Sequence, residues 1–306
     1  MAGYAGSKAA IDPKCHQHEA FESDRNVRQD REMWRNLSGR NDLSDRKIVI
    51  FDLDGTLTKS KSDIDRGMGS LVAELLKLKF VAVTSGCSYQ QFESQFLRGL
   101  PGRINLSNLY LFPTNSASGY YYDEKRVRFV RVYQNSLPLR DVKKILSAFE
   151  NVFAQINYES PRKTYGPVFE NRGSQLTFSA LGQSAPLRYK QKWDPDQKKR
   201  LRIRRLLRKR LPEFQISIGG TTSIDVTRKG VDKTLCVRKL KEHLNVNLKD
   251  MLFVGDALFP GGNDHIMKSV GIKCVSVSGP EETKALIKRI IQNASVAPSA
   301  RVPVAI

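Results

Sequence analysis

The sequence contains no run of about 18 apolar residues, the length that a transmembrane helix requires. Its first residues, MAGYAGSKAAIDPK, lack the apolar segment of a secretory signal peptide. Cysteine is scarce: the four cysteines show no CxxC spacing, which in a chain of this size is typical of reduced thiols rather than a disulfide scaffold. The sequence therefore predicts a cytoplasmic protein with no membrane span.

Acidic residues are few beside the basic ones. The chain has 31 Asp and Glu against 51 Lys and Arg, a formal net charge of +20. This excess favours anionic partners: phosphorylated metabolites, nucleic acid or an acidic membrane surface. The hydrophobic content of 40% and charged content of 27% exclude a collagen-like or wholly disordered chain. At roughly 100–200 residues per domain, 306 residues make one large or two modest domains.

Alternating strand and helix patterns dominate two separate stretches of the chain. The apolar run Ile48–Phe51 is typical of a strand buried on both faces of a parallel sheet. Strand and helix patterns then alternate through residues 47–116 and again through 230–292. This alternation predicts one α/β core with a Rossmann-like parallel sheet.

The segment between these stretches has a different pattern. Residues 117–229 are rich in short strand patterns and turn residues, which predicts an inserted α+β cap domain. We expect its antiparallel strands at 120–122, 127–132, 176–180 and 214–218, and its helices at 139–157 and 194–211. Outside the predicted domains, residues 1–46 are expected to form a polar, irregular arm and residues 293–306 a loose tail.

The motif DLDGT, residues 52–56, follows the first predicted strand. Side chains two apart on an extended chain point the same way, so Asp52 and Asp54 should converge just beyond the carboxyl end of that strand. This end of a parallel sheet is where α/β proteins bind ligands. Two crowded carboxylates favour a bound cation, and an oxygen-only site that meets phosphate suits Mg²⁺.

Three further segments are expected at the same edge of the sheet. Asp256 and Asp264, in GDALFPGGND, follow a second buried strand and are interpreted as completing the metal site. Ser85 follows the second core strand, where a hydroxyl and backbone N–H groups suit a phosphate. Lys233, at the start of a predicted helix, would neutralise phosphate and carboxylates.

This ordered set of motifs resembles the haloacid dehalogenase superfamily of phosphotransferases. The position of the insert resembles subfamily IIB, and the segments GGTTSIDV, GVDK and PGGNDH are similar to those of eukaryotic phosphomannomutases. The resemblance spans roughly residues 47–292 and implies an aspartyl-phosphate mechanism. It implies Asp52 as the nucleophile, Asp54 as the acid and base, and Ser85 and Lys233 as ligands of the transferring phosphoryl group.

The resemblance also implies the ligands of Mg²⁺ and the substrate contacts. Asp52, the Asp54 backbone carbonyl and Asp256 would bind the metal, with Asp264 close by. In the cap, Arg172, Ser223 and Asp225 would contact the substrate.

At Gln183 the chain departs from the family pattern, because the mutases carry an arginine there that grips the distal phosphate of a bisphosphate intermediate. A neutral amide favours a sugar-phosphate phosphatase, and a phosphomannomutase-like sugar phosphomutase is the alternative.

The stretch KKRLRIRRLLRKR, residues 198–210, allows a third hypothesis. A helix this basic suits a phosphate backbone, so the further alternative is a nucleic-acid-binding protein that uses this segment. No aromatic interleaving, zinc spacing or recognition motif accompanies it. The preferred interpretation is a solvated cap helix that packs through its leucines and attracts anionic substrates. The sugar, the acceptor and the oligomeric state are not fixed by the sequence.

Overall fold

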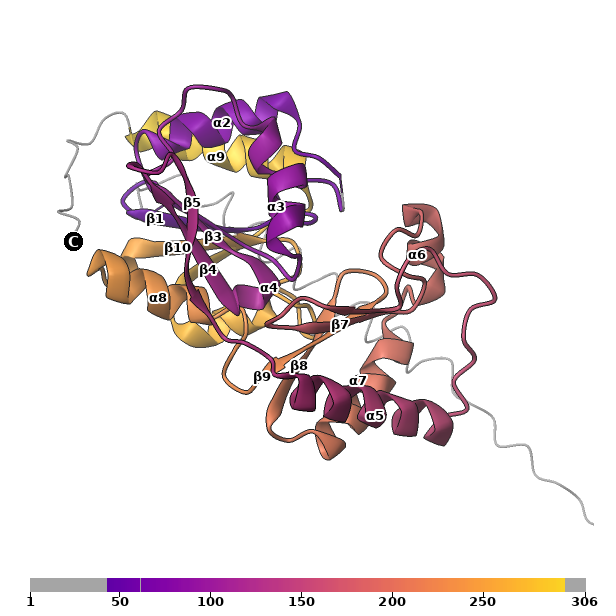
Figure 1. The fold of residues 1–306 in the computed structure, drawn as a ribbon. Coiled ribbons are helices and arrows are strands. Elements are labelled where there is room, and N and C mark those ends of the chain that lie inside the picture. Colours follow the sequence, from indigo (N-terminus) through magenta and orange to yellow (C-terminus); the bar gives the residue numbers. More distant parts are fainter. Residues whose placement is uncertain (1–42, 61, 295–306) are drawn as a thin grey trace, which may run out of the picture. The chain divides into compact units, whose positions relative to one another are not determined.

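Two β-sheets organise the protein, in a computed structural model that describes residues 43–60 and 62–294 (Figure 1). All of these residues belong to one structural unit. Most of the expected N-terminal arm and C-terminal tail lies outside the described residues. Within them, no helix combines the length and the apolar character that crossing a membrane requires.

The larger sheet has seven strands in the order β11-β10-β1-β2-β3-β4-β5. The strands are β1 (Ile48–Asp52), β2 (Phe80–Thr84), β3 (Leu109–Phe112), β4 (Ser118–Asp123), β5 (Arg128–Gln134), β10 (Met251–Gly255) and β11 (Lys273–Ser276). Pairing is parallel from β11 through β3, and β4 and β5 add an antiparallel hairpin. The α/β fold with a parallel sheet is therefore confirmed.

Helices cover both faces of this sheet, which explains why every residue of β1 is buried. The elements are α2 (Arg66–Leu76), α3 (Tyr89–Gln95), η1 (Leu97–Gly99), α4 (Pro113–Ser116), α8 (Leu235–Leu244), η2 (Leu248–Asp250), η3 (His265–Val270) and α9 (Pro280–Ala294). Figure 1 shows α2 and α9 side by side over one face and α8 over the other. Ile48 and Ile50 pack with Leu240 of α8 in one buried cluster. The continuous apolar strands of the sequence are thus the two-sided centre of the sheet.

The smaller sheet is antiparallel, in the order β6-β7-β9-β8. Its strands are β6 (Phe169–Asn171), β7 (Leu176–Ser179), β8 (Phe214–Gly219) and β9 (Ser223–Arg228), and its helices are α5 (Leu139–Gln155), α6 (Leu187–Trp193) and α7 (Lys198–Arg210). Phe149 of α5 and Ile203 of α7 pack with Phe178 and Ile224 of the sheet. Because strand side chains alternate, the opposite face of β7 and β9 carries polar side chains.

One expectation about this smaller sheet is wrong. The strand patterns at 120–122 and 127–132 belong to β4 and β5 of the larger sheet, not to an inserted one. The reason is pairing: Tyr121 lies opposite Tyr110 of β3, so the hairpin extends the core sheet along that edge. The segment that leaves the larger sheet, called the insert below, therefore starts after Gln134 rather than at residue 117, and extends to residue 229. The division into two domains stays a proposal.

The basic stretch forms helix α7, which packs through Ile203 and Leu207 and buries one of its arginines. Arg200 donates through Nε to Asp194 Oδ2 at 2.7 Å, and the two side chains are 2% and 0% exposed. The Arg200 guanidinium also donates to the Gly220 carbonyl at 2.5 Å. The pair thus ties the start of α7 to the turn between β8 and β9.

Replacing Arg200 with methionine should lower the free energy of unfolding by about 3–5 kcal/mol, because Asp194 would be left buried without its counter-charge. Urea titration followed by circular dichroism measures this loss. Arg205→Met removes the same group from an exposed position on the same helix and should cost less than about 1 kcal/mol. Equal losses in the two variants would contradict a structural role for the pair.

Candidate functional site

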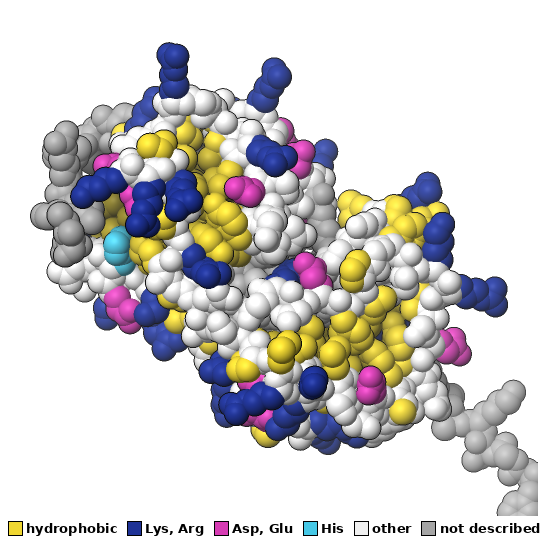
Figure 2. All heavy atoms as spheres, viewed as in Figure 1, with side chains coloured by type: hydrophobic (Ala, Val, Ile, Leu, Met, Phe, Trp, Pro, Cys, Tyr) yellow, Lys and Arg dark blue, Asp and Glu magenta, His cyan; other side chains and the backbone are white. Residues whose placement is uncertain are grey.

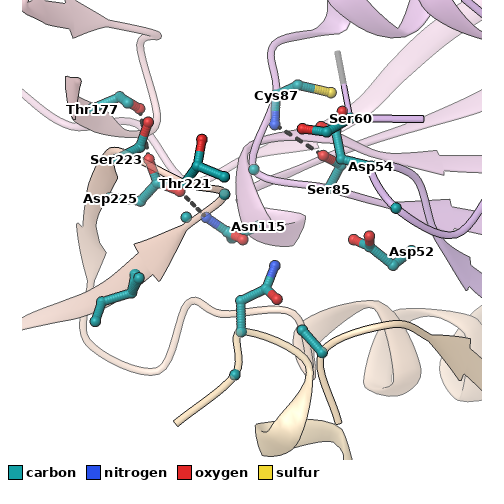
Figure 3. Close-up of a pocket in the computed structure, with 18 of the residues that line it drawn as sticks. Asp52, Asp54, Ser60, Ser85, Cys87, Asn115, Thr177, Thr221, Ser223 and Asp225 are labelled. Carbon is teal, nitrogen blue, oxygen red and sulfur yellow. Dashed lines mark hydrogen bonds between the residues drawn. The ribbon is translucent and has the colours of Figure 1, made fainter. Parts of the chain in front are cut away.

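A cavity lies where the carboxyl ends of the parallel strands meet the polar face of the smaller sheet. Asp52, Asp54 and Ser85 line it from the larger sheet, and Thr177 and Asp225 line it from the smaller one (Figure 3). The site residues predicted from the sequence all line this cavity except Lys233 and Asp264, which lie behind Asp52 and bond to each other. The structure therefore brings the predicted residues together.

Asp52 is the last residue of β1 and only 2% exposed. Its Oδ1 accepts a hydrogen bond from Lys233 Nζ at 2.5 Å, whereas its Oδ2 is buried with no hydrogen-bond partner among the described residues. Burial raises the pKa of this carboxyl, and the charge of Lys233 opposes that rise. An oxygen held in place but unsatisfied is suited to bond with an incoming group or cation.

Lys233 lies just before α8, with its ammonium between two carboxylates. It donates to Asp264 Oδ1 at 2.6 Å as well as to Asp52, and its side chain is 2% exposed. Burial acts to lower the pKa of Lys233, but the fields of Asp264 and Asp52 outweigh it and raise the pKa. Lys233 therefore stays charged. Asp264 is held from its other side, where Oδ2 accepts from the Ala257 backbone N–H at 3.2 Å.

Three carboxylates crowd this end of the sheet. Asp52, Asp256 and Asp264 each offer an oxygen, and these oxygens lie within 4.8 Å of one another. Burial, followed by the charge of Asp264, raises the pKa of Asp256 to about 7. Gly55 leaves room for Asp256, because a Cβ on Gly55 would come within 2.4 Å of Asp256 Oδ2.

This donor set fits a hard divalent cation such as Mg²⁺. It consists of oxygens alone, and it gathers one oxygen from each of three carboxyl groups around the single ammonium of Lys233. The carboxylate of Asp54 is not part of the three-carboxylate cluster. Asp54 lines the cavity, and a role for its backbone carbonyl at the metal stays a prediction.

Ser85 and Arg172 approach the cavity from different sheets near the exit of β2. Ser85 is 3% exposed and lines the cavity, and its Oγ accepts from the Cys87 backbone N–H at 3.2 Å. Arg172 lines the same cavity from the insert, donates to Glu170 at 2.7 Å and also donates to the Gly86 carbonyl. Arg172 thus joins the insert to the loop that would hold a phosphoryl group.

Asn115 lies at the centre of the site and is not among the residues predicted from the sequence. Its Nδ2 donates to Gln175 Oε1 at 2.9 Å and to Asp225 Oδ2 at 3.1 Å, and Figure 3 shows it between the two sheets. Asp225 Oδ1 in turn accepts from Thr177 Oγ1 at 2.9 Å. Asp225, predicted to contact substrate, therefore also anchors the polar face of the insert to the core.

A signal for Asn115 was available in the sequence. It follows β3 as Ser85 follows β2, and the carboxyl ends of parallel strands meet at one edge. Its backbone is left-handed, with φ of 53°, and Thr114 and Ser116 flank it at 54° and 64°. Three successive left-handed residues without glycine cannot be predicted from side-chain type.

The remaining predicted substrate contacts lie on the insert wall. Ser223 shares a hydrogen bond with Ser179 at 2.8 Å between hydroxyl oxygens, and Gln183 Nε2 donates to Ser179 Oγ at 2.8 Å. Lys190 Nζ donates to the Gln183 carbonyl at 2.7 Å. Among the described residues that line the cavity, Arg172 is the single arginine or lysine.

Known proteins resemble this chain in sequence over most of its length. A sequence model of the eukaryotic phosphomannomutase family matches residues 68–293. The chain is similar to a phosphomannomutase of Solanum lycopersicum, with 28% identity over 242 residues that cover 77% of this chain and 90% of the relative. It is also similar to a probable phosphomannomutase of Caenorhabditis elegans, with 26% identity over 258 residues, 81% of this chain and 97% of the relative.

Solved structures share its fold. An IMP-nucleotidase of Plasmodium falciparum superimposes with a TM-score of 0.60 at 16% identity, covering 82% of this chain and 71% of that one. A haloacid dehalogenase-like hydrolase from Bacteroides thetaiotaomicron gives 0.53 at 16% identity, covering 80% and 99%. At these identities the likeness concerns the fold alone.

Proposed function

The chain belongs to the eukaryotic phosphomannomutase family, and from this premise we propose that it is a Mg²⁺-dependent phosphomutase acting on a sugar phosphate through an aspartyl-phosphate on Asp52. The observation that carries the proposal is Asp52 itself: one carboxylate oxygen is held by Lys233 and the other is buried and unsatisfied at the cavity. The family match begins after this residue, so the role of Asp52 is supported by geometry and motif.

The proposed reaction assigns each group at the site one task. Asp52 attacks phosphorus, and the bond to the sugar oxygen breaks as the bond to the carboxylate forms. Asp54 gives a proton to the leaving sugar oxygen and takes one back from the oxygen that attacks the aspartyl-phosphate. Ser85 and Lys233 hold the phosphoryl oxygens in line between the two.

Asp52, the Asp54 carbonyl and Asp256 would hold Mg²⁺, with Asp264 supporting them through Lys233. When bound, the cation offsets like charge around the transferring phosphoryl group. Without it, three carboxyl groups crowd around one ammonium, and the negative charge that they carry repels a phosphate dianion.

A phosphomutase and a phosphatase differ in the molecule that accepts the phosphoryl group from Asp52. The names of the relatives support a mutase, in which the sugar accepts it again at a second position. The phosphatase expected from the sequence is not confirmed by the comparisons. It remains the second candidate because of one observation: Gln183 contributes a neutral amide to the cavity where a distal phosphate would need a cation.

A parallel assay tests the proposal. The full chain is incubated with hexose 1-phosphates and 6-phosphates, with and without a hexose bisphosphate; phosphorus NMR measures isomerisation and a colorimetric reaction measures free phosphate. We expect isomerisation to exceed hydrolysis, to rise with the bisphosphate, to vanish in EDTA and to return with Mg²⁺. Release of phosphate without isomerisation would overturn the mutase in favour of the phosphatase.

A charge variant sharpens that test. Gln183→Arg places a cation in the cavity, so the ratio of isomerisation to hydrolysis should rise by about tenfold if a distal phosphate visits this wall. Gln191→Arg, which adds the same charge at an exposed position on α6, is the matched control and should leave the ratio unchanged. An equal effect of both variants would point to general attraction of anions.

We also propose a cytoplasmic location. Cys87 and Cys236 are buried thiols and not disulfide partners, which is consistent with a reducing compartment.

A further inference from the structure

A second cavity, called the arginine groove below, lies beside the catalytic one. Arg204 and Arg208 of α7 and Ser217 of β8 line it from the insert, and His265 and Lys268 of η3 line it from the core. None of the described residues that line it is aspartate or glutamate. The groove is therefore a cationic space without an acidic side chain among the described lining residues, and its walls come from both the insert and the core.

The two arginines lie one turn apart on the same face of α7. Arg208 donates to the Ile216 carbonyl at 3.4 Å, and the side chain of Arg204, which is half-buried, has no hydrogen bond or ion pair with any described residue. Burial, followed by the charge of Arg208, lowers the pKa of Arg204. Partial burial of a guanidinium next to a second positive charge costs free energy when no carboxylate is nearby. A bound anion would offset this cost.

The same helix shows what a structural arginine looks like. Arg200, four residues before Arg204, is fully buried and has its own carboxylate, Asp194. The buried arginine of α7 therefore has an acidic partner within the chain. Arg204 and Arg208 have no such partner among the described residues, so an anion from outside would have to balance their charge.

The groove borders the catalytic cavity. Ile218, Gly262 and Asn263 line both spaces, so a ligand in the groove lies next to the substrate pocket. An anion held by Arg204 and Lys268 would touch the insert and the core at once.

We propose that the arginine groove is a second anion-binding site, which takes the phosphate of a phosphorylated small molecule distinct from the phosphoryl group at Asp52. The site goes beyond the proposed function, because nothing in its recognition depends on chemistry at Asp52. Arginine forks suit phosphate oxygens bidentately, and Ser217 and His265 add shorter polar groups at the same site.

A discrete phosphate suits this groove better than a nucleic acid. Single-stranded nucleic acid is usually bound with aromatic side chains on which bases stack, and no described phenylalanine, tyrosine or tryptophan lines the groove. Figure 2 shows basic side chains gathered along the lower edge of the insert, where α5 and α7 lie in Figure 1. Exposed cations of α7, such as Arg202 and Arg205, do not line the groove.

Calorimetric titration of the full chain with inorganic pyrophosphate, in EDTA and low salt, tests the proposal. The variant Arg204→Gln with Arg208→Gln should weaken binding by at least about tenfold, since charge-assisted hydrogen bonds are lost. Lys268→Gln, on the opposite wall, should also weaken it. The matched control, Arg202→Gln with Arg205→Gln, removes the same charge from exposed positions and should change binding less than about twofold.

Melting curves establish whether each variant is folded. If the double variant Arg204→Gln with Arg208→Gln does not fold, Lys268→Gln still tests the site. Equal weakening in the double variant and its control, or in neither, would overturn the site. A labelled 20-mer oligonucleotide is titrated in parallel. One outcome would overturn the proposed anion site: the oligonucleotide binds tightly, both double arginine variants weaken its binding equally, and pyrophosphate does not bind. The basic charge of α7 would then belong to a nucleic-acid-binding surface. Because the titration needs neither Mg²⁺ nor turnover, its result does not depend on whether the proposed enzyme activity is found.

Discussion

Asp52→Asn should lower turnover of a sugar phosphate by at least about a thousandfold, because the amide cannot attack phosphorus and the aspartyl-phosphate cannot form. The substitution preserves the shape of the side chain, and Lys233 keeps its bond to Asp264. The loss should therefore appear in kcat with little change in folding. Initial rates with saturating substrate and Mg²⁺ measure it.

A second readout separates chemistry from folding in this variant. Asp52 supplies one of the three crowded carboxylates, so Asp52→Asn should also reduce the rise in melting temperature that Mg²⁺ produces in the native protein. Asp63→Asn, a matched change at an exposed position, should keep both the rate and the Mg²⁺ effect. Activity of Asp52→Asn within about tenfold of the native protein would rule out Asp52 as the nucleophile.

Lys233→Met should lower stability and activity together. The ammonium is buried between Asp52 and Asp264, so its removal leaves negative charge in the core without compensation, at a cost of about 3–5 kcal/mol in the free energy of unfolding. Activity should fall by at least about a hundredfold, because the cation that would hold the phosphoryl group is gone. Denaturant titration and initial rates measure the two effects.

A double variant distinguishes the two roles of Lys233. Adding Asp264→Asn to Lys233→Met removes one of the stranded carboxylates and should restore part of the stability while activity stays low. Lys229→Met, at an exposed position four residues earlier, should be neutral in both measurements. Stability of Lys233→Met equal to that of Lys229→Met would show that the buried ion pairs contribute nothing to the fold.

The cluster of acidic residues at the carboxyl end of the larger sheet was predictable because its sequence signals are local. A buried apolar run followed by Asp52 and Asp54, and a second run followed by Asp256, need only the rule that parallel strands end at one edge. Each of these residues sits within a few positions of the strand that carries it. The same rule predicts the position of Ser85 after β2, and it would also have predicted the position of Asn115 after β3.

The hairpin of β4 and β5 was assigned to the wrong sheet for a non-local reason. The alternation in residues 120–122 and 127–132 predicts a hairpin but not its neighbour, and the pairing of Tyr121 with Tyr110 decides that. The polar bridge from Asn115 to Asp225 escaped prediction likewise, because it joins residues 110 positions apart. Contacts of this kind depend on how the parts dock, which side-chain type alone does not encode.

Apolar and polar side chains alternate along β7 and β9, so neighbouring positions on these strands are constrained in different ways as the sequence evolves. Leu176 and Phe178 face the helices α5 and α7, so substitutions there are limited by the need to fold. Thr177 and Ser223 face the cavity, and if the proposed function holds, substitutions there would change the surface offered to a substrate as well as the hydrogen bonds to Asp225 and Ser179. Successive positions on one strand thus answer to different selective pressures. A new substrate preference can arise on this wall by changes at every second residue while the packing behind it stays as it is.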